Sequence, residues 1–217
     1  MDIEHDIEVL RSDLLQMSRL SQRAVDYSIK AYQLGRPEFC QHVCNTEQDL
    51  RRLQRSIAER GHTLLADGLP VDSHSCLASF ALRICSALDI TYTAATGIAQ
   101  NTMLHLEDGR VAGSPALEEM GHLVNSLVRL CTVALFKEEV QHAKTVLQND
   151  GTGQWFDLAA YQAHSDPTQR TSAQARFELA ISKSLGQIAE QAHEIADAIA
   201  FLLVGKDCIG ATHQRAA

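Results

Sequence analysis

Apolar and small residues recur at alternating intervals of three and four along most of the chain, and this spacing limits the possible folds more than any other feature. It places these residues on one face of an α-helix, and that face must be buried against other helices. The clearest stripe comprises Ile181, Leu185, Ile188, Ala192, Ile195, Ile199 and Leu202. The sequence therefore predicts an all-α protein built from amphipathic helices.

Glycine and proline divide the pattern into six long helices. Their stripes span, in chain order, residues 3–31, 43–64, 77–98, 117–131, 137–162 and 181–202. The first helix is expected to end at Leu34-Gly35 and the sixth at Gly205, because glycine commonly terminates helices. The fifth helix is expected to bend or break at Asp150-Gly151-Thr152-Gly153, since glycine weakens a helix interior by about 1 kcal/mol.

The two halves of the chain repeat the same pattern in the same order. Helix four aligns with helix one and helix six with helix three, through the pairs Leu14–Leu117, Met17–Met120, Ile84–Ile181, Leu88–Leu185, Ala95–Ala192 and Ile98–Ile195. A duplicated unit of this kind indicates two tandem three-helix bundles with up-down topology. We expect the first bundle at residues 1–108, the second at 114–207 and a C-terminal tail at 208–217.

Charge and hydropathy exclude several classes of protein. The formal net charge is −8, so the chain offers no basic stripe for a nucleic-acid backbone. The start of the sequence is acidic and does not resemble a signal peptide. The longest apolar run, Ala198–Val204, is far shorter than the ~20 residues of a membrane-spanning helix. We therefore expect a cytoplasmic protein that reaches a membrane only through a partner.

The cysteine content agrees with a reducing compartment. The six cysteines lie at irregular spacings and are interpreted as reduced residues that fill the core. Cys40 and Cys44 share a helix face with His42 between them, a weak pattern for a soft metal. No nucleophile elbow, phosphate-binding glycine loop, Cys-x-x-Cys pair or dinucleotide fingerprint occurs. The sequence thus reads as a non-enzymatic interaction module.

The closing helix carries a family resemblance. Residues 185–207 read LGQIAEQAHEIADAIAFLLVGKD, and this stretch resembles the last helix of the phosphate-uptake regulator (PhoU) family. The resemblance extends over most of the chain and implies two tandem three-helix bundles. It also implies a regulator that connects a phosphate ABC transporter to a sensor histidine kinase, and that forms a homodimer.

The same family carries an acidic metal motif in each third helix, and this sequence keeps half of each copy. Asp89 retains the leading acid of the first motif, while Thr93 replaces the trailing one. Glu190 retains the trailing acid of the second motif, while Gly186 replaces the leading one. A hard cation needs several oxygen ligands, so weak or absent binding of a divalent or iron cation is expected. Glu47 and Asp150 are further candidate ligands that the resemblance suggests.

A di-metal carboxylate bundle, such as a ferritin-like oxidase or metal store, is the alternative. The spacing Glu-x-x-His, which such proteins use, occurs at Glu59–His62, Glu119–His122, Glu139–His142 and Glu190–His193. Helical geometry turns Glu59, Glu119 and Glu190 away from the apolar stripes of their helices. We therefore expect these acids on outer faces, together with the acidic cluster of Glu190, Glu194 and Asp197, which is a solvated face, a docking surface or a cation site.

Overall fold

The computed structural model describes residues 3–66, 73–107, 114–149 and 172–214. Every regular element in these ranges is an α-helix: α1 (Ile3–Leu34), α2 (Pro37–Cys44), α3 (Glu47–Ala66), α4 (Ser73–Glu107), α5 (Pro115–Lys137), α6 (Val140–Leu147) and α9 (Ser172–Gln214). The predicted all-α class is confirmed. Of the predicted fifth helix the structure describes α6, and the Asp150–Gly153 break lies outside the described residues. The predicted end of the sixth helix at Gly205 is wrong, because α9 continues to Gln214, into the predicted tail.

Glycine and proline explain where α1 ends and where α5 begins. Gly35 follows α1 with φ +60, a conformation that glycine adopts at no steric cost, and its N–H donates to the Ala31 carbonyl at 3.0 Å. Pro115 occupies the first turn of α5, where its missing N–H leaves no hydrogen bond unmade. The predicted end of the first helix at Leu34-Gly35 is thus confirmed.

The prediction of one continuous second helix is wrong, because the structure has two separate helices there, α2 and α3. Helix α2 ends at Cys44 and α3 begins at Glu47, with Asn45 and Thr46 in a turn between them. The Val43 carbonyl accepts hydrogen bonds from the Thr46 hydroxyl at 2.8 Å and from the Tyr92 hydroxyl of α4 at 3.0 Å. The apolar stripe did not reveal the break, because Val43 and Leu50 are seven residues apart, which is also the spacing within a continuous helix.

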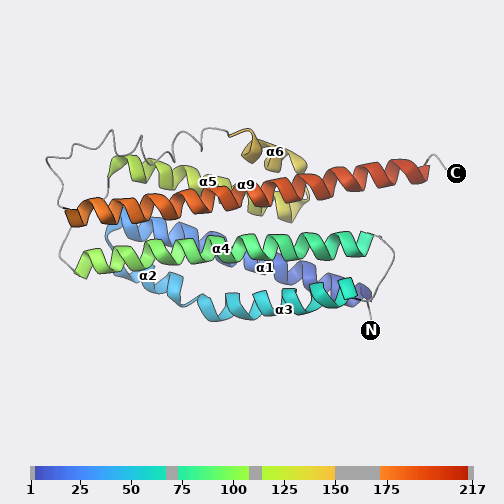
Figure 1. Cartoon of the computed structure of the whole chain (residues 1–217), viewed down its shortest axis with the longest axis horizontal. Helices are drawn as coiled ribbons and strands as arrows, with labels where there is room; N and C mark the ends of the chain where they lie inside the picture. The colour runs from blue at the N-terminus through green and yellow to red at the C-terminus, as the bar shows by residue number, and fades with distance from the viewer. Residues whose placement is uncertain (1–2, 67–72, 108–113, 150–171, 215–217) are drawn as a thin grey trace.

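The described helices form two units that lie side by side, four helices in the first and three in the second (Figure 1). In the first, α1 and α4 pack together and α2 and α3 cover them; in the second, α6 packs on α5 and α9. Contacts between α1 and α5 and between α4 and α9 join the units. In Figure 1, α5 runs opposite to α1 and α9 opposite to α4. The predicted pair of up-down bundles is therefore present.

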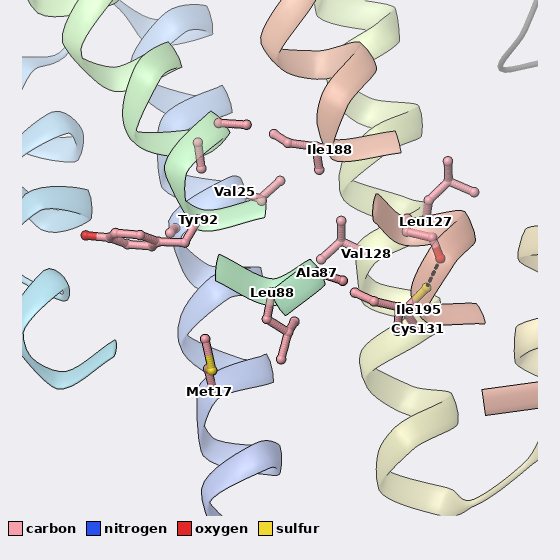
Figure 2. Close-up of a cluster of buried hydrophobic side chains, with 14 of the residues drawn as sticks. Met17, Val25, Ala87, Leu88, Tyr92, Leu127, Val128, Cys131, Ile188 and Ile195 are labelled. Carbon is pink, nitrogen blue, oxygen red and sulfur yellow. Dashed lines mark hydrogen bonds between the residues drawn. The ribbon is translucent and has the colours of Figure 1, made fainter. Parts of the chain in front are cut away.

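One continuous core runs through both units. Figure 2 shows Val25, Ala87 and Leu88 of the first unit on the side that faces Val128, Ile188 and Ile195 of the second, whereas the Tyr92 ring points the other way. The repeated positions agree, since both members of each pair named above are buried. Hydroxyls also meet across the junction, where Ser18 donates to Thr132 at 3.2 Å. Among the described residues, no helix combines the length and apolar content needed to cross a membrane.

Candidate functional site

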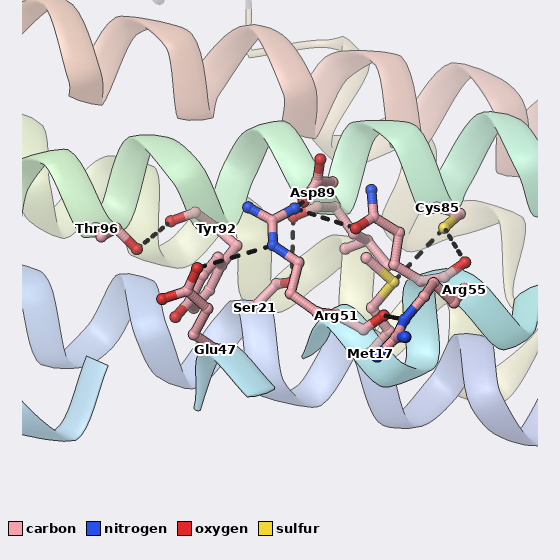
Figure 3. A network of polar contacts seen from close by, with 11 residues as sticks. Met17, Ser21, Glu47, Arg51, Arg55, Cys85, Asp89, Tyr92 and Thr96 are labelled. Carbon is pink, nitrogen blue, oxygen red and sulfur yellow. Dashed lines mark hydrogen bonds and ion pairs between the residues drawn. The ribbon is translucent and has the colours of Figure 1, made fainter. Parts of the chain in front are cut away.

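The structure brings two of the four predicted site residues together. Asp89 lies on α4 and Glu47 at the start of α3, and both contact the guanidinium of Arg51 (Figure 3). Glu190 lies on the exposed side of α9, away from this group, and pairs with no cation among the residues that the structure describes. Asp150 lies outside the described residues. The two half-motifs therefore do not form one joint site.

We call Glu47, Arg51, Gln54 and Asp89 the Arg51 cluster. Arg51 Nη1 donates to Asp89 Oδ1 at 2.7 Å and to Gln54 Oε1 at 3.1 Å. Arg51 Nε lies 3.9 Å from Glu47 Oε1, which is too long for a hydrogen bond. The Asp89 side chain is 24% exposed and that of Glu47 is 60% exposed. The short contact to Asp89 is therefore the stronger of the two interactions, and it ties α3 to α4.

This arrangement does not suit the metal that the resemblance implies. The Arg51 guanidinium already neutralises Asp89 and occupies the space beside its carboxylate. Position 93 supplies a hydroxyl in place of the second acid. A hard cation requires several oxygen ligands around one point, and no group of three or more His, Cys, Asp or Glu side chains among the described residues is placed to hold one. We therefore assign no metal to Asp89 or Glu190.

A second arginine lies within the acidic face of α9. Arg83 Nη2 donates to Glu194 Oε2 at 2.8 Å and to Asp197 Oδ2 at 2.9 Å, and we call these three residues the Arg83 cluster. The two carboxylates raise the pKa of the Arg83 guanidinium above its ordinary value. All three side chains are at least 45% exposed, so solvent weakens the pairing. The cluster connects the two bundles across the α4–α9 contact.

Sequence reasoning missed both arginines. Arg51 carries a detectable signal, because it follows Glu47 by four residues and such pairs meet on a helix surface. Arg83 carries none, because its partners are 111 and 114 residues away along the chain. Only the packing of α4 against α9 brings these charges together.

The geometry also decides against a di-metal carboxylate centre. Glu59, Glu119, Glu139 and Glu190 are all exposed. Glu139 pairs with the neighbouring His142 at 3.1 Å, and the His193 ring contacts the Ala189 carbonyl of its own helix at 3.0 Å. A buried di-metal centre requires its acids to point between the helices. The prediction that these acids lie on outer faces agrees with the structure.

The described cysteines behave as predicted for core-filling thiols, with two exceptions. Cys40, Cys85 and Cys131 are buried, whereas Cys44 and Cys76 are exposed. Burial, together with a smaller contribution from the nearby Cys44, raises the pKa of Cys40 to about 11. Burial likewise raises the pKa of Cys131 to about 12. No group of three or more His, Cys, Asp or Glu side chains among the described residues is placed to hold a metal, so we assign none to the Cys40–Cys44 pair.

Fold and site together define a class: an all-α protein of two joined helical bundles whose outer faces carry arginine-bridged acids. Within that class, the chain has the fold of PhoU proteins. It superposes on PhoU from Pseudomonas aeruginosa with a TM-score of 0.83 and 21% identity, covering 94% of this chain and 100% of that one. It superposes on the phosphate transport system regulatory protein PhoU from Streptococcus pneumoniae with a TM-score of 0.79 and 20% identity, covering 94% and 98%. No protein-family model and no curated protein matches the sequence.

Proposed function

We propose that this protein is a divergent PhoU-family regulator of phosphate uptake and phosphate-starvation signalling, and that it acts without catalysis. The observation that supports the proposal most is the agreement of fold over 94% of the chain with PhoU from Pseudomonas aeruginosa. The resemblance of residues 185–207 to the family's closing helix supports it independently of the structure. The loss of the metal motifs marks the chain as divergent.

In this proposal the protein is a cytoplasmic adaptor, and it is a homodimer. It contacts the ATPase of a phosphate ABC transporter and a sensor histidine kinase, without binding nucleic acid or inserting into the membrane. The net charge of −8 supports protein partners over nucleic acid. Exposed acidic side chains of α9, such as Glu190, form a surface to which a basic patch on a partner would bind.

Affinity capture from the native host tests the proposal. The tagged protein is isolated from cells grown in high and in low phosphate, and co-purifying proteins are identified by mass spectrometry. We expect a phosphate-transporter ATPase or a sensor histidine kinase in at least one condition. In parallel, deletion of the gene is expected to switch on phosphate-starvation genes in phosphate-rich medium. Capture of neither partner, together with unchanged gene expression, would overturn the proposal.

A matched pair of variants locates the docking surface. Glu190→Lys reverses an exposed charge on α9, and Glu8→Lys makes the same change on the exposed side of α1. Both positions lie on helix surfaces, so both variants are expected to fold. We expect Glu190→Lys to reduce partner recovery and Glu8→Lys to leave it unchanged. Equal recovery with both variants would exclude this face of α9 as the docking surface.

A further inference from the structure

A cavity lies where α1, α4, α5 and α9 meet, near the start of α1. Its volume is about 200 Å³. Each of the four helices contributes apolar side chains to its wall, among them Leu14, Leu15, Phe80, Ala81, Phe136 and Leu203. Helices α1 and α4 belong to one bundle and α5 and α9 to the other. A molecule bound here would therefore contact both halves of the protein.

Two charged side chains, Arg11 of α1 and Glu138 at the end of α5, also line this cavity. Arg11 Nη1 lies 3.9 Å from Glu138 Oε1, and the two side chains are 50% and 54% exposed. A separation of 3.9 Å is longer than a hydrogen bond, and exposed pairs of this kind contribute little to stability. The planar guanidinium therefore retains donors for a closer, two-pronged contact with another carboxylate.

The backbone of Glu138, which lines the cavity, has an unusual conformation. Glu138 adopts φ 53 and ψ 34, in the left-handed region, and it is the one non-glycine residue with positive φ among the described residues. A side chain makes this conformation unfavourable, and such residues concentrate at ligand-binding and switch positions. The backbone conformation thus singles out Glu138 as the residue where the cavity wall departs from helical geometry.

The choice between an anionic and a cationic ligand depends on which charged residue of the lining has unused hydrogen-bonding groups. Besides Arg11, the Arg19 guanidinium lies 4.1 Å from the ring centre of Phe136, which lines the cavity. Lys137 is the exposed residue between Phe136 and Glu138. Arg11 is the one cation and Glu138 the one carboxylate in the part of the cavity lining that the structure describes, and Glu139 beside it is a further exposed acid. Glu138 makes a further interaction, whereas Arg11 makes no hydrogen bond to the residues that the structure describes, so Arg11 is the member of the pair with unused hydrogen-bonding groups. An incoming carboxylate would be attracted to Arg11 rather than repelled.

We propose that this cavity binds a small amphiphile with a carboxylate head and an apolar tail. The head pairs with Arg11 and displaces the loose contact with Glu138, while the tail fills the space between the four helices. A cavity of about 150 Å³ holds a benzene ring, so about 200 Å³ accommodates a tail of roughly six to eight carbons. Binding at this position would stabilise the junction of the two bundles and so supply a regulatory input.

Titration calorimetry on the full chain tests the proposal with three probes of equal chain length. Octanoate carries the anionic head, 1-octanol a neutral one and octylamine a cationic one, and all are used below their aggregation concentrations. We expect saturable 1:1 binding of octanoate, about ten-fold tighter than that of octanol, since a charge-assisted pair adds about one decade in affinity. Octylamine is expected to bind more weakly than either.

Variants separate this site from nonspecific uptake. Arg11→Gln should bring octanoate to the affinity of octanol, whereas Arg23→Gln, on the same helix but beside Tyr27, should leave the preference intact. Leu15→Trp should fill the cavity and weaken all three probes. The proposal is overturned if octanoate does not bind saturably, if octylamine binds as tightly, or if Arg11→Gln and Arg23→Gln behave alike. Circular dichroism confirms that each variant is folded.

Discussion

Two glycines in helix interiors have different surroundings, and alanine should affect them in opposite ways. A Cβ at Gly97 of α4 would lie 3.5 Å from Ser184 Oγ, an ordinary contact, so Gly97→Ala should raise the free energy of unfolding by about 0.5–1 kcal/mol. A Cβ at Gly61 of α3 would lie 2.8 Å from Leu82 Cγ, so Gly61→Ala should lower it by about 1–2 kcal/mol. Urea denaturation measures both; equal shifts would contradict this packing.

The buried thiol of Cys131 should make stability depend on pH in the alkaline range. Its folded-state pKa is raised to about 12 by burial, and its Sγ lies 3.1 Å from the Ala192 carbonyl. Because the folded state holds the proton more tightly than the unfolded state, this contribution is complete below about pH 9 and is lost as the pH rises towards 12.

Urea denaturation at pH 8 and pH 10.5 measures this effect. Between these values, Cys131 should account for a loss of about 2 kcal/mol. Cys131→Ala should reduce the pH dependence by that amount, although the variant is itself less stable. Cys76→Ala, at an exposed thiol of α4, should leave the pH dependence unchanged. The same pH dependence in both variants would show that Cys131 is not a tightly buried thiol.

At the scale of helices, the Arg51 cluster should contribute to the free energy of unfolding through only one of its two ion pairs. A double-mutant cycle of Arg51→Gln and Asp89→Asn should give a coupling of about 0.5–1 kcal/mol, because these atoms are 2.7 Å apart and Asp89 is partly buried. The cycle of Arg51→Gln with Glu47→Gln is the control and should give almost none at 3.9 Å. A larger coupling to Glu47 would reverse our assignment of the strong pair.

The apolar face of α9 can be tested at its centre. Ile188 is fully buried, so Ile188→Asp should remove its burial and place a carboxylate without a partner among apolar side chains. We expect a loss of about 3 kcal/mol or more in the free energy of unfolding, measured by urea denaturation. Gln187→Asp, one position away on the exposed side, should change it by less than about 0.5 kcal/mol. If both variants unfold like the parent, the packing face of α9 is incorrectly assigned.

Features within one helix were predictable from the sequence, and features between helices were not. The stripe from Ile181 to Leu202 identified the buried face of α9, because burial follows the 3.6-residue period. The break at Asn45 was missed, since its cause includes a hydroxyl from another helix. Asp89 and Glu47 were named as candidate metal ligands through the family resemblance, but the arginine between them and the Arg83 cluster depend on how helices pack.

At the scale of the whole molecule, the shared core should make the two bundles unfold together. We propose that residues 1–108 and 114–207 are the two repeated halves of one cooperative unit. Calorimetry should then show a single transition whose calorimetric and van't Hoff enthalpies agree. Leu53→Ala in the first half and Ile188→Asp in the second should each shift that one transition. Two separate transitions would show that the halves are independent domains.

The break between α2 and α3 depends on a residue far away in the sequence. The Tyr92 hydroxyl and the Thr46 hydroxyl share the Val43 carbonyl, although Tyr92 lies 49 positions away. The point at which α2 ends is therefore determined partly by a residue of α4. Over evolutionary time, positions 46 and 92 should vary together: lineages that lose the tyrosine hydroxyl should also lose the interruption, and their second helix should run straight.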